Sequence, residues 1–313
     1  MSSQRAEPTK MKHKPQPWWS NPRARQRLIP FALIAPAFLV VFALAAYSFV
    51  WLVYLSTQDL TFGQPVHEGR PVGLANYIWL LTNSGSIFWI SVRTTAIHVL
   101  GTTLPELLLG FAIALLLNRQ MRGGSLLTAV LIIPIVLMPS MVGLVARLYF
   151  TYDGLVNFFV ETFTGSRFNW SGPERALTSV ILVDIWEWTP FFILILLAGL
   201  QTLPREPYEA ALVDGASRWQ SFRFITLPMM FPLILTALVL RLMDVLRIFD
   251  VIYVMFGGGP GSATTTLPLL TYRTTLVQEY VGRGSAVSIM LIIIIVTLTY
   301  LLIQLRARVT HQP

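Results

Sequence analysis

The chain has 313 residues and a net charge of +8; 54% of its residues are hydrophobic and 12% are charged. One soluble core of this length needs fewer apolar residues, so the composition predicts an integral membrane protein with several spans. The chain contains no cysteine, which excludes disulfides, thiolate metal sites and cysteine nucleophiles. Its four histidines lack metal-ligand spacing, so we predict neither a metal site nor a catalytic residue.

The first 27 residues form a basic tail with seven lysines and arginines. We expect a disordered start and a position at the lipid headgroups for Trp18 and Trp19. All lysines of the chain lie in this tail, at Lys10, Lys12 and Lys14. A nucleotide-binding loop of the form G-x-x-x-x-G-K-[ST] needs a lysine, so the body of the chain contains none. The chain is therefore not expected to hydrolyse ATP by itself.

Six apolar stretches are long enough to cross a bilayer. We predict spans at about 28–55, 91–117, 126–149, 176–200, 229–255 and 284–305. The first stretch is uncharged from Leu28 to Gln58, which is too long for a signal-peptide core, so we expect it to stay in the membrane. The predicted fold class is all-α, a polytopic transmembrane domain over 28–305 with a short tail at 306–313.

The distribution of lysine and arginine predicts the orientation, because positively charged loops resist translocation. With the N-terminal tail inside, fourteen such residues fall in the tails and inner loops, against five in the outer loops. Both termini are therefore predicted to be cytoplasmic. The positive net charge then reflects topology and contact with anionic lipids, and no nucleic-acid partner is expected.

The loop between the fourth and fifth predicted spans, 201–228, carries the most informative pattern. Glu206 and Glu209 suit the N-terminus of a helix and Pro207 suits its first turn, so a short helix is predicted from about Pro207. Asp214 and Arg218 are spaced to pair on one side of it. Apolar and small residues recur on another side, at Tyr208, Ala211, Leu212, Gly215 and Trp219. Such a stripe alone is more typical of a loop helix packed on its own protein.

The full spacing of the loop is E-A-A, three residues, Gly, nine residues, I-x-L-P, from Glu209 to Pro228. It resembles the EAA loop of permease subunits from binding-protein-dependent ABC importers, at every fixed position. The resemblance implies that a cytoplasmic helix docks on a separate ATPase subunit, and the charge bias independently predicts that this loop is cytoplasmic. The residues to which it assigns ATPase coupling are Tyr208, Glu209, Ala210, Ala211, Leu212, Asp214, Gly215, Ala216, Ile225, Leu227 and Pro228.

The region after the fifth predicted span resembles carbohydrate-uptake permeases, the group of maltose, glycerol-3-phosphate and trehalose systems. Those proteins usually show F-D-x-I-Y-x-x-T-x-G-G-P, and this chain matches from Phe249 to Pro260 except that Phe256 replaces the threonine. The replacement of this threonine affects the assignment of a particular sugar more than the resemblance to the family. The glycines of this segment lack the lysine of a phosphate site and are predicted to form a turn that leaves the membrane.

The resemblance implies that the chain is the first permease of a pair and forms half of a pathway for a sugar or sugar-like solute. Its implied partners are a second homologous permease, two cytoplasmic ATP-binding subunits, an extracytoplasmic solute-binding protein and membrane lipids. ATP and Mg would be bound by the ATPase subunits, so no cofactor is expected in this chain. The implied location is the plasma membrane of a bacterium or archaeon, with several passes.

Charged residues inside predicted spans suggest function, because an unpaired charge is expensive in hydrocarbon. In the fifth span, opposite charges alternate at three-residue steps and so can pair along a helix: Arg241, Asp244, Arg247 and Asp250. One interpretation is structural pairing between spans. The other is contact with a solute, since sugars are held by carboxylates and aromatic faces. The candidate pathway residues are Asp184, Trp186, Glu187, Asp244 and Tyr253.

A different class of function remains open at this point. Glu106 and His98 lie near one face of the second span, where they could relay protons; a buried hydrogen-bonded pair or a contact with another subunit is the more usual role of such residues. An ion-coupled secondary transporter would use Glu106, Asp184 and Asp244 as coupling sites. We find no convincing internal repeat of the kind such carriers often contain, and this class leaves the loop at 201–228 unexplained. A third class, a membrane-embedded enzyme, would need a nucleophile or a metal cluster, and the sequence shows neither.

Overall fold

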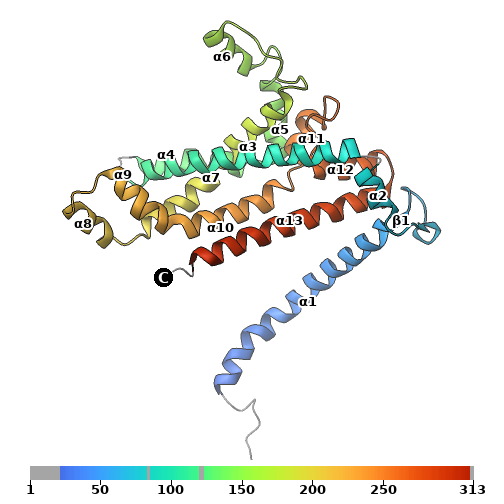
Figure 1. Ribbon diagram of the computed structural model, residues 1–313, viewed down its shortest axis with the longest axis horizontal. Helices are drawn as coiled ribbons and strands as arrows, with labels where there is room; N and C mark the ends of the chain where they lie inside the picture. Colours follow the sequence, from blue (N-terminus) through green and yellow to red (C-terminus); the bar gives the residue numbers. More distant parts are fainter. Residues whose placement is uncertain (1–21, 83–84, 120–122, 311–313) are drawn as a thin grey trace, which may run out of the picture. The chain divides into compact units, whose positions relative to one another are not determined.

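The computed structural model describes residues 22–82, 85–119 and 123–310. The described part is helical apart from one two-stranded sheet, which confirms the predicted all-α class (Figure 1). Most of the basic tail predicted at 1–27, and the end of the tail predicted at 306–313, lie outside the described residues. The chain divides into two compact units, residues 1–52 and 53–313.

Helix α1, Pro22–Ser56, makes up the described part of the first unit and reaches into the second. Its segment Leu33–Ser56 is long and apolar enough to cross a membrane. Large side chains along it are exposed, such as Phe38 at 61% and Val41 at 66%. Exposed apolar side chains of this kind suit contact with lipid rather than water.

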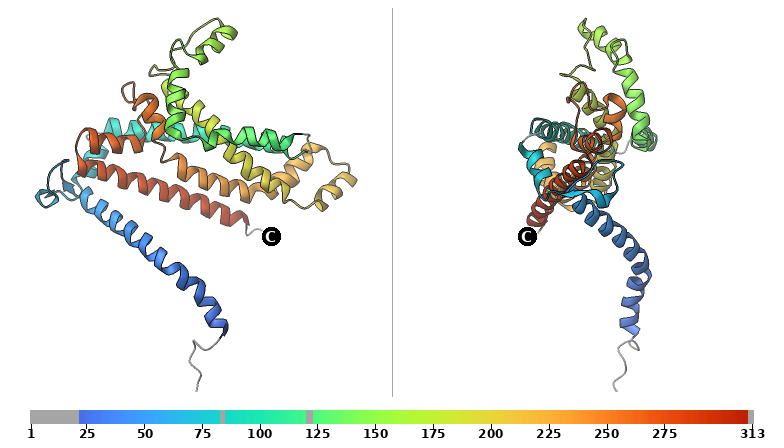
Figure 2. Two further views of the ribbon diagram at one scale, coloured as in Figure 1. Left: turned by 180° about the vertical axis from the view of Figure 1, so that it is seen from behind. Right: turned by 90° about the vertical axis from the view of Figure 1, so that its right-hand side faces the viewer.

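Four long helices of the second unit run side by side (Figures 1 and 2). They are α3 Gly85–Leu117, α7 Ala176–Gln201, α10 Leu227–Val245 and α13 Val281–Thr310. Glycines permit close approach between them, because a Cβ at Gly110 of α3 would collide with Phe192 of α7, and one at Gly199 of α7 would collide with Leu233 of α10. Within the described residues, five single helices could each span a membrane, and a bent pair supplies a sixth candidate.

The third predicted span, 126–149, is not one helix. It consists of α4, Gly124–Val136, and α5, Pro139–Tyr149, which meet at a 93° bend. Pro139 restricts the residue before it, and Met138 accordingly has an extended backbone with φ −69° and ψ 127°. The apolar composition of the stretch is continuous, so hydropathy alone does not reveal the break.

The fifth predicted span, 229–255, is also shifted and broken. Helical structure begins earlier, with α9 Arg218–Ser221 and the π-helix η3 Phe222–Thr226, and α10 ends at Val245. Helix α11, Asp250–Phe256, starts afresh, with Asp250 in its first turn where the helix dipole favours a negative charge. The three-residue alternation of charges therefore does not run along one helix.

The end of the bundle away from α8, Glu206–Val213, is built from several short elements. They are β1 Gln58–Asp59, the 3-10 turn η2 Val66–Glu68, β2 Arg70–Pro71, α2 Ala75–Thr82, α12 Leu267–Tyr272 and the π-helix η4 Arg273–Val277. An isolated bridge between Thr61 and Tyr280 joins the first of these loops to the start of α13. In the glycine-rich turn, Arg273 donates to the carbonyl oxygen of Gly257 at 2.7 Å.

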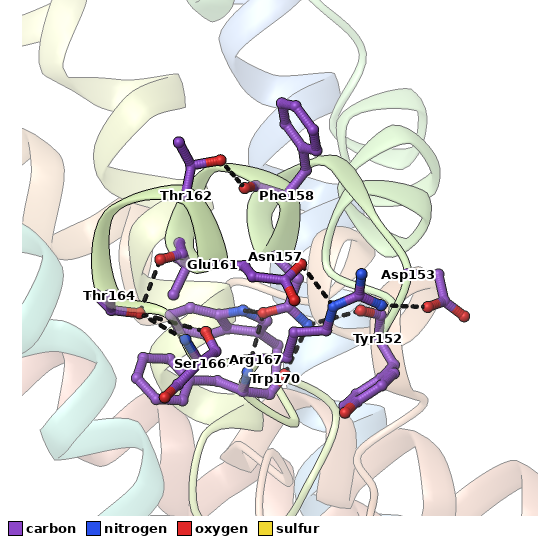
Figure 3. Close-up of polar contacts among 12 residues, drawn as sticks. Tyr152, Asp153, Asn157, Phe158, Glu161, Thr162, Thr164, Ser166, Arg167 and Trp170 are labelled. Atoms are coloured by element: carbon purple, nitrogen blue, oxygen red, sulfur yellow. Dashed lines mark hydrogen bonds and ion pairs between the residues drawn. The ribbon is translucent and has the colours of Figure 1, made fainter.

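Helix α6, Leu155–Thr164, follows α5 and belongs to a segment, 152–170, that is held together by polar side-chain contacts (Figure 3). The Asn157 amide donates to the carbonyl oxygens of Tyr152 and Phe168, both at 2.8 Å, and its oxygen accepts from the Trp170 indole at 2.9 Å. Arg167 bridges Asp153 and Glu161, at 2.8 Å each. These contacts fold the segment back toward the start of α7.

A charged cluster joins three helices inside the bundle. Arg241 of α10 is 1% exposed, and its Nε and Nη2 donate to both carboxylate oxygens of Glu106 on α3, at 2.7 Å each. Nη2 also donates to Asp184 on α7 at 2.8 Å, and Nη1 donates to Asp244 at 3.0 Å. The guanidinium lies over the ring of Trp188, 4.5 Å from its centroid. One side chain thus holds α3, α7 and α10 together.

His98 of α3 joins the same cluster but does not pair with Glu106. Its Nε2 lies 3.2 Å from Asp184 Oδ2, whereas both oxygens of Glu106 accept from Arg241. The two side chains share a helix and contact different partners. The two residues that the sequence places near one face therefore make two separate contacts in one buried cluster, His98 with Asp184 and Glu106 with Arg241.

Replacing Glu106 with alanine removes the bidentate partner of Arg241, so the buried Nε–H loses its acceptor while Asp184 and Asp244 still pair with the guanidinium. We expect the free energy of unfolding to fall by about 3–5 kcal/mol. The measurement is denaturant unfolding of the purified protein in detergent micelles. The matched control is Glu174→Ala, at an exposed position, which should change stability by less than about 0.5 kcal/mol. Equal stabilities for the two variants would contradict the role assigned to the cluster.

Candidate functional site

A cavity of about 320 Å³ lies beside the buried arginine. Helices α5, α7, α10 and α11 and the connection at 246–249 form its walls. The polar residues that line it are Asp184, Glu187, Arg241, Asp244, Arg247 and Asp250. Its apolar wall includes Pro139, Trp188, Ile248, Phe249 and Val251. Charged groups and one indole therefore surround a space that lies within the membrane-spanning part of the fold.

Helix α7 presents Asp184, Glu187 and Trp188 to this cavity, at the spacing i, i+3, i+4 that places residues on one helix face. Trp186 lies on another face. It is 53% exposed and lines a separate apolar groove with Met141 of α5. Trp186 is a predicted pathway residue and Trp188 is not, although the spacing from Asp184 and Glu187 distinguishes the two tryptophans.

Tyr253, another predicted pathway residue, lies in an aromatic cluster instead of the cavity lining. Its ring centroid is 5.2 Å from those of Phe249 and Tyr272, and its hydroxyl is 3.3 Å from the Tyr272 hydroxyl. Asp250, three residues earlier, does line the cavity. Of the five predicted pathway residues, the structure brings Asp184, Glu187 and Asp244 together at this site.

The charges predicted to pair in the fifth span divide into two groups. Arg241 and Asp244 form an ion pair on α10. Arg247 follows the end of that helix and donates from Nε to the carbonyl oxygen of Met243 at 3.1 Å. Asp250 begins α11 and also lines the cavity, whereas Arg247 lies in the connection between α10 and α11.

Two carboxylate oxygens at the cavity have no partner within the described residues. Glu187 is 2% exposed, and its Oε2 accepts no hydrogen bond from the part of the chain that the structure describes. The same holds for Oδ1 of Asp184, whose other oxygen accepts from Arg241. Buried polar atoms are rarely left in this state. Asp244, whose side chain is 42% exposed, and Asp250 offer accessible hydrogen-bond acceptors in a lining that also contains an indole ring, an arrangement suited to binding hydroxyl groups.

A second candidate site lies at one end of the bundle, on the loop that contains α8 (Figure 1). The helix ends in a tight turn at Gly215, which has φ +75°. There the Ala216 N–H donates to the Ala211 carbonyl oxygen at 2.9 Å. Ser217 and Gln220 then form a capping box that starts α9. Asp214 and Arg218 therefore lie on either side of a turn, and the predicted stripe through Trp219 is divided between two helices.

Large apolar side chains of this loop are exposed at the end of the bundle: Leu212 at 77%, Val213 at 87%, Trp219 at 66% and Phe224 at 70%. Glu209 and Ala210 are exposed as well. Ile225 and Leu227 are half-buried where η3 joins α10, and Pro228 lies in the first turn of α10. The loop thus combines an uncovered apolar surface with a fixed attachment to a long helix.

Tyr208 connects α8 to that attachment. Its hydroxyl lies 3.0 Å from the Thr226 hydroxyl, in hydrogen-bond contact. A groove of about 580 Å³ beside this contact is lined by the ends of two further helices, at Leu115 of α3 and Leu200 of α7. Helix α8 therefore lines a groove together with α3 and α7, and Tyr208 bonds to the residue that directly precedes α10.

Comparison with known proteins identifies the family. Residues 106–310 match the family model described as "Binding-protein-dependent transport system inner membrane component". The trehalose/maltose transport system permease protein MalF of Thermococcus litoralis is 36% identical over 283 residues, which cover 90% of this chain and 94% of that protein. The sulfoquinovosyl glycerol transport system permease protein SmoG of Agrobacterium fabrum is 35% identical over 269 residues, or 85% of this chain and 86% of the relative.

A solved bacterial ABC transporter, involved in the import of the acidic polysaccharide alginate, has the same fold in one of its chains. The TM-score is 0.77 at 20% identity, over 92% of this chain and 98% of that chain. The family match spans α8 and every helix that lines the cavity. The chain belongs to the inner membrane components of binding-protein-dependent transport systems and is a permease subunit of an ABC importer.

Proposed function

We propose that this permease forms half of the pathway for a sugar or sugar-like solute and that ATPase subunits drive it by docking on the loop at 201–228. The observation that carries the proposal is α8, a short helix that is followed by a tight turn at Gly215 and exposes Leu212 and Val213. Uncovered apolar side chains rimmed by polar residues are typical of a protein interface. Tyr208, Glu209 and their neighbours in the EAA pattern would contact the ATPase.

The same loop supplies a route for motion. Tyr208 contacts Thr226 at 3.0 Å, and Thr226 directly precedes α10. Helix α10 carries Arg241 and Asp244 to the cavity. A displacement of α8 by a docked ATPase would therefore act on a helix that lines the proposed solute pathway. ATP and Mg would remain in the ATPase subunits.

The proposed solute class rests on the cavity and on the relatives. The carboxylates of the lining suit solute hydroxyl groups, and the Trp188 ring suits the apolar face of a sugar. The relative MalF is named for trehalose and maltose transport. The proposed pathway residues are Asp184, Glu187, Trp188 and Asp244, with Trp186 and Tyr253 outside the cavity.

Further partners follow from the same proposal: a second homologous permease, two cytoplasmic ATP-binding subunits, an extracytoplasmic solute-binding protein and surrounding lipids. We propose that both termini are cytoplasmic, in support of which the sequence has fourteen lysines and arginines in the predicted inner tails and loops, the loop at 201–228 among them, against five in the predicted outer loops. The ion-coupled alternative is not favoured, because Glu106, Asp184 and Asp244 all accept from Arg241.

Uptake by the complex reconstituted in proteoliposomes should require both ATP and the ATPase subunits, with radiolabelled trehalose and maltose as the first solutes to test. Glu209→Lys should abolish uptake and co-purification of the ATPase while membrane insertion stays unchanged, because it reverses a charge on the exposed docking helix. Glu174→Lys, an exposed change beyond the opposite end of α7, is the control and should behave as wild type. Uptake that persists without ATP would contradict the proposal.

Gly215 offers a test of the turn that closes α8. A Cβ there meets nothing within 4 Å, so a substitution acts through the left-handed backbone and not through a collision. Asparagine tolerates this conformation and valine does not, at a cost of about 1–2 kcal/mol. We expect Gly215→Asn to keep transport-coupled ATP hydrolysis and Gly215→Val to lower it about tenfold. Equal hydrolysis rates in the two variants would show that the turn is not needed for coupling.

The two tryptophans of α7 form a matched pair of probes for the pathway. Trp188→Leu should reduce uptake about tenfold, since it removes the cavity's indole and the cation–π contact with Arg241, a contact of up to about 2 kcal/mol. Trp186→Leu should change uptake by less than about twofold, because Trp186 faces an apolar groove. Both variants should assemble with their partners, as measured by co-purification. A larger defect for Trp186→Leu would place the pathway elsewhere.

A further inference from the structure

The charges around the cavity are unbalanced. Its lining contains four carboxylates, Asp184, Glu187, Asp244 and Asp250, and two guanidinium groups, Arg241 and Arg247. Arg241 is already engaged by Asp184, by Asp244 and by Glu106, which lies behind the lining. Arg247 is the remaining cation of the lining, and its Nε is used by the Met243 carbonyl oxygen. The excess of acidic groups is therefore not cancelled by the cavity's own cations.

Glu187 is the carboxylate of the lining that has an unpartnered oxygen and no cation bound to it within the described residues. The side chain is almost fully buried, lines the cavity and keeps Oε2 without a partner within the described residues. A buried carboxylate oxygen needs a donor, and Oε2 is closed to a molecule the size of water, so a donor in the cavity satisfies it once the side chain turns toward that space. Hydroxyl and ammonium groups are donors, whereas carboxylate, phosphate and sulfonate groups offer further acceptors and a like charge.

We propose that this cavity selects solutes by charge, admitting neutral or cationic sugar-like molecules that donate a hydrogen bond to Glu187 and repelling anionic ones. The inference rests on the proposed function of the cavity as a solute pathway. It adds a property that the permease itself imposes, in addition to any selection by a solute-binding protein. The acidic lining focuses a negative potential between low-dielectric helix walls, which raises the local concentration of cations and lowers that of anions.

The absence of cysteine in this chain permits a direct measurement of that potential. Ile248→Cys introduces one thiol at the cavity wall. In the assembled complex, its rates of modification by cationic trimethylammonium-ethyl and anionic sulfonato-ethyl methanethiosulfonates are followed by the mass of this subunit and divided by the rates for a free thiol. We expect a normalised cation-to-anion ratio above about ten.

Two variants and one control position make the measurement specific. Glu187→Gln and Asp250→Asn, each combined with Ile248→Cys, should lower the ratio at least about threefold, because each removes an acidic group from the lining. Gln64→Cys, in an exposed loop, should give a ratio near one. Phe249→Cys, at a second lining position, repeats the test if the first thiol reacts too slowly to measure.

A ratio near or below one at the cavity overturns the proposal, as does a ratio that Glu187→Gln leaves unchanged. Absence of reaction at both Ile248→Cys and Phe249→Cys also overturns it, because the cavity is then closed to hydrated solutes. Thiol modification does not depend on uptake. A permease that needs ATP but lacks charge selection would refute this inference alone, whereas uptake without ATP would refute the proposed function alone.

Discussion

Arg241 determines how the bundle is organised, because one buried guanidinium binds carboxylates from α3 and α7 and from its own helix α10. Neither Glu106 nor Asp184 could be buried at this depth without such a partner, and removal of Arg241 leaves both carboxylates without their cation in a low-dielectric interior. Trp188 completes the arrangement by covering the guanidinium at 4.5 Å. The ion pairs therefore serve both as the joint between three helices and as one wall of the cavity.

Periodicity and composition were sufficient to predict the helical class, the helix on the loop at 201–228 and the presence of buried charges. They could not predict the pairing, because Glu106 and Arg241 are 135 residues apart and only the fold brings them together. Trp186 and Trp188 show a limit of a different kind. Both are tryptophans, two residues apart on α7. Only the side of the helix on which each one lies, relative to Asp184 and Glu187, determines that Trp188 lines the cavity and Trp186 the apolar groove.

The two breaks in the predicted spans, at 137–138 and 246–249, have local causes that a hydropathy profile does not detect. Apolar residues continue through the first break, and the second contains mostly apolar residues with only Arg247 charged, so a search for long apolar runs passes over both. Pro139 forces the residue before it into an extended conformation, and Asp250 starts a new helix. The consequence reaches the site, because both breaks border the cavity: Pro139 lies at one of them and Phe249 at the other.

The cavity therefore lies between two kinds of wall. Helices α3, α7 and α10 are joined by the bonds of Arg241, whereas α5 and α11 pack on each other through Gly143, whose Cβ position lies 3.2 Å from Val251, and each follows a non-helical connection. Widening the cavity by parting the first wall would break buried ion pairs, at about 3–5 kcal/mol for an unpaired partner. Rotation at the connections 137–138 and 246–249 breaks none of them. Arg241 thus fixes one wall of the cavity through buried ion pairs, whereas the α5–α11 pair closes the other wall by apolar packing on Val180 and Val183 of α7.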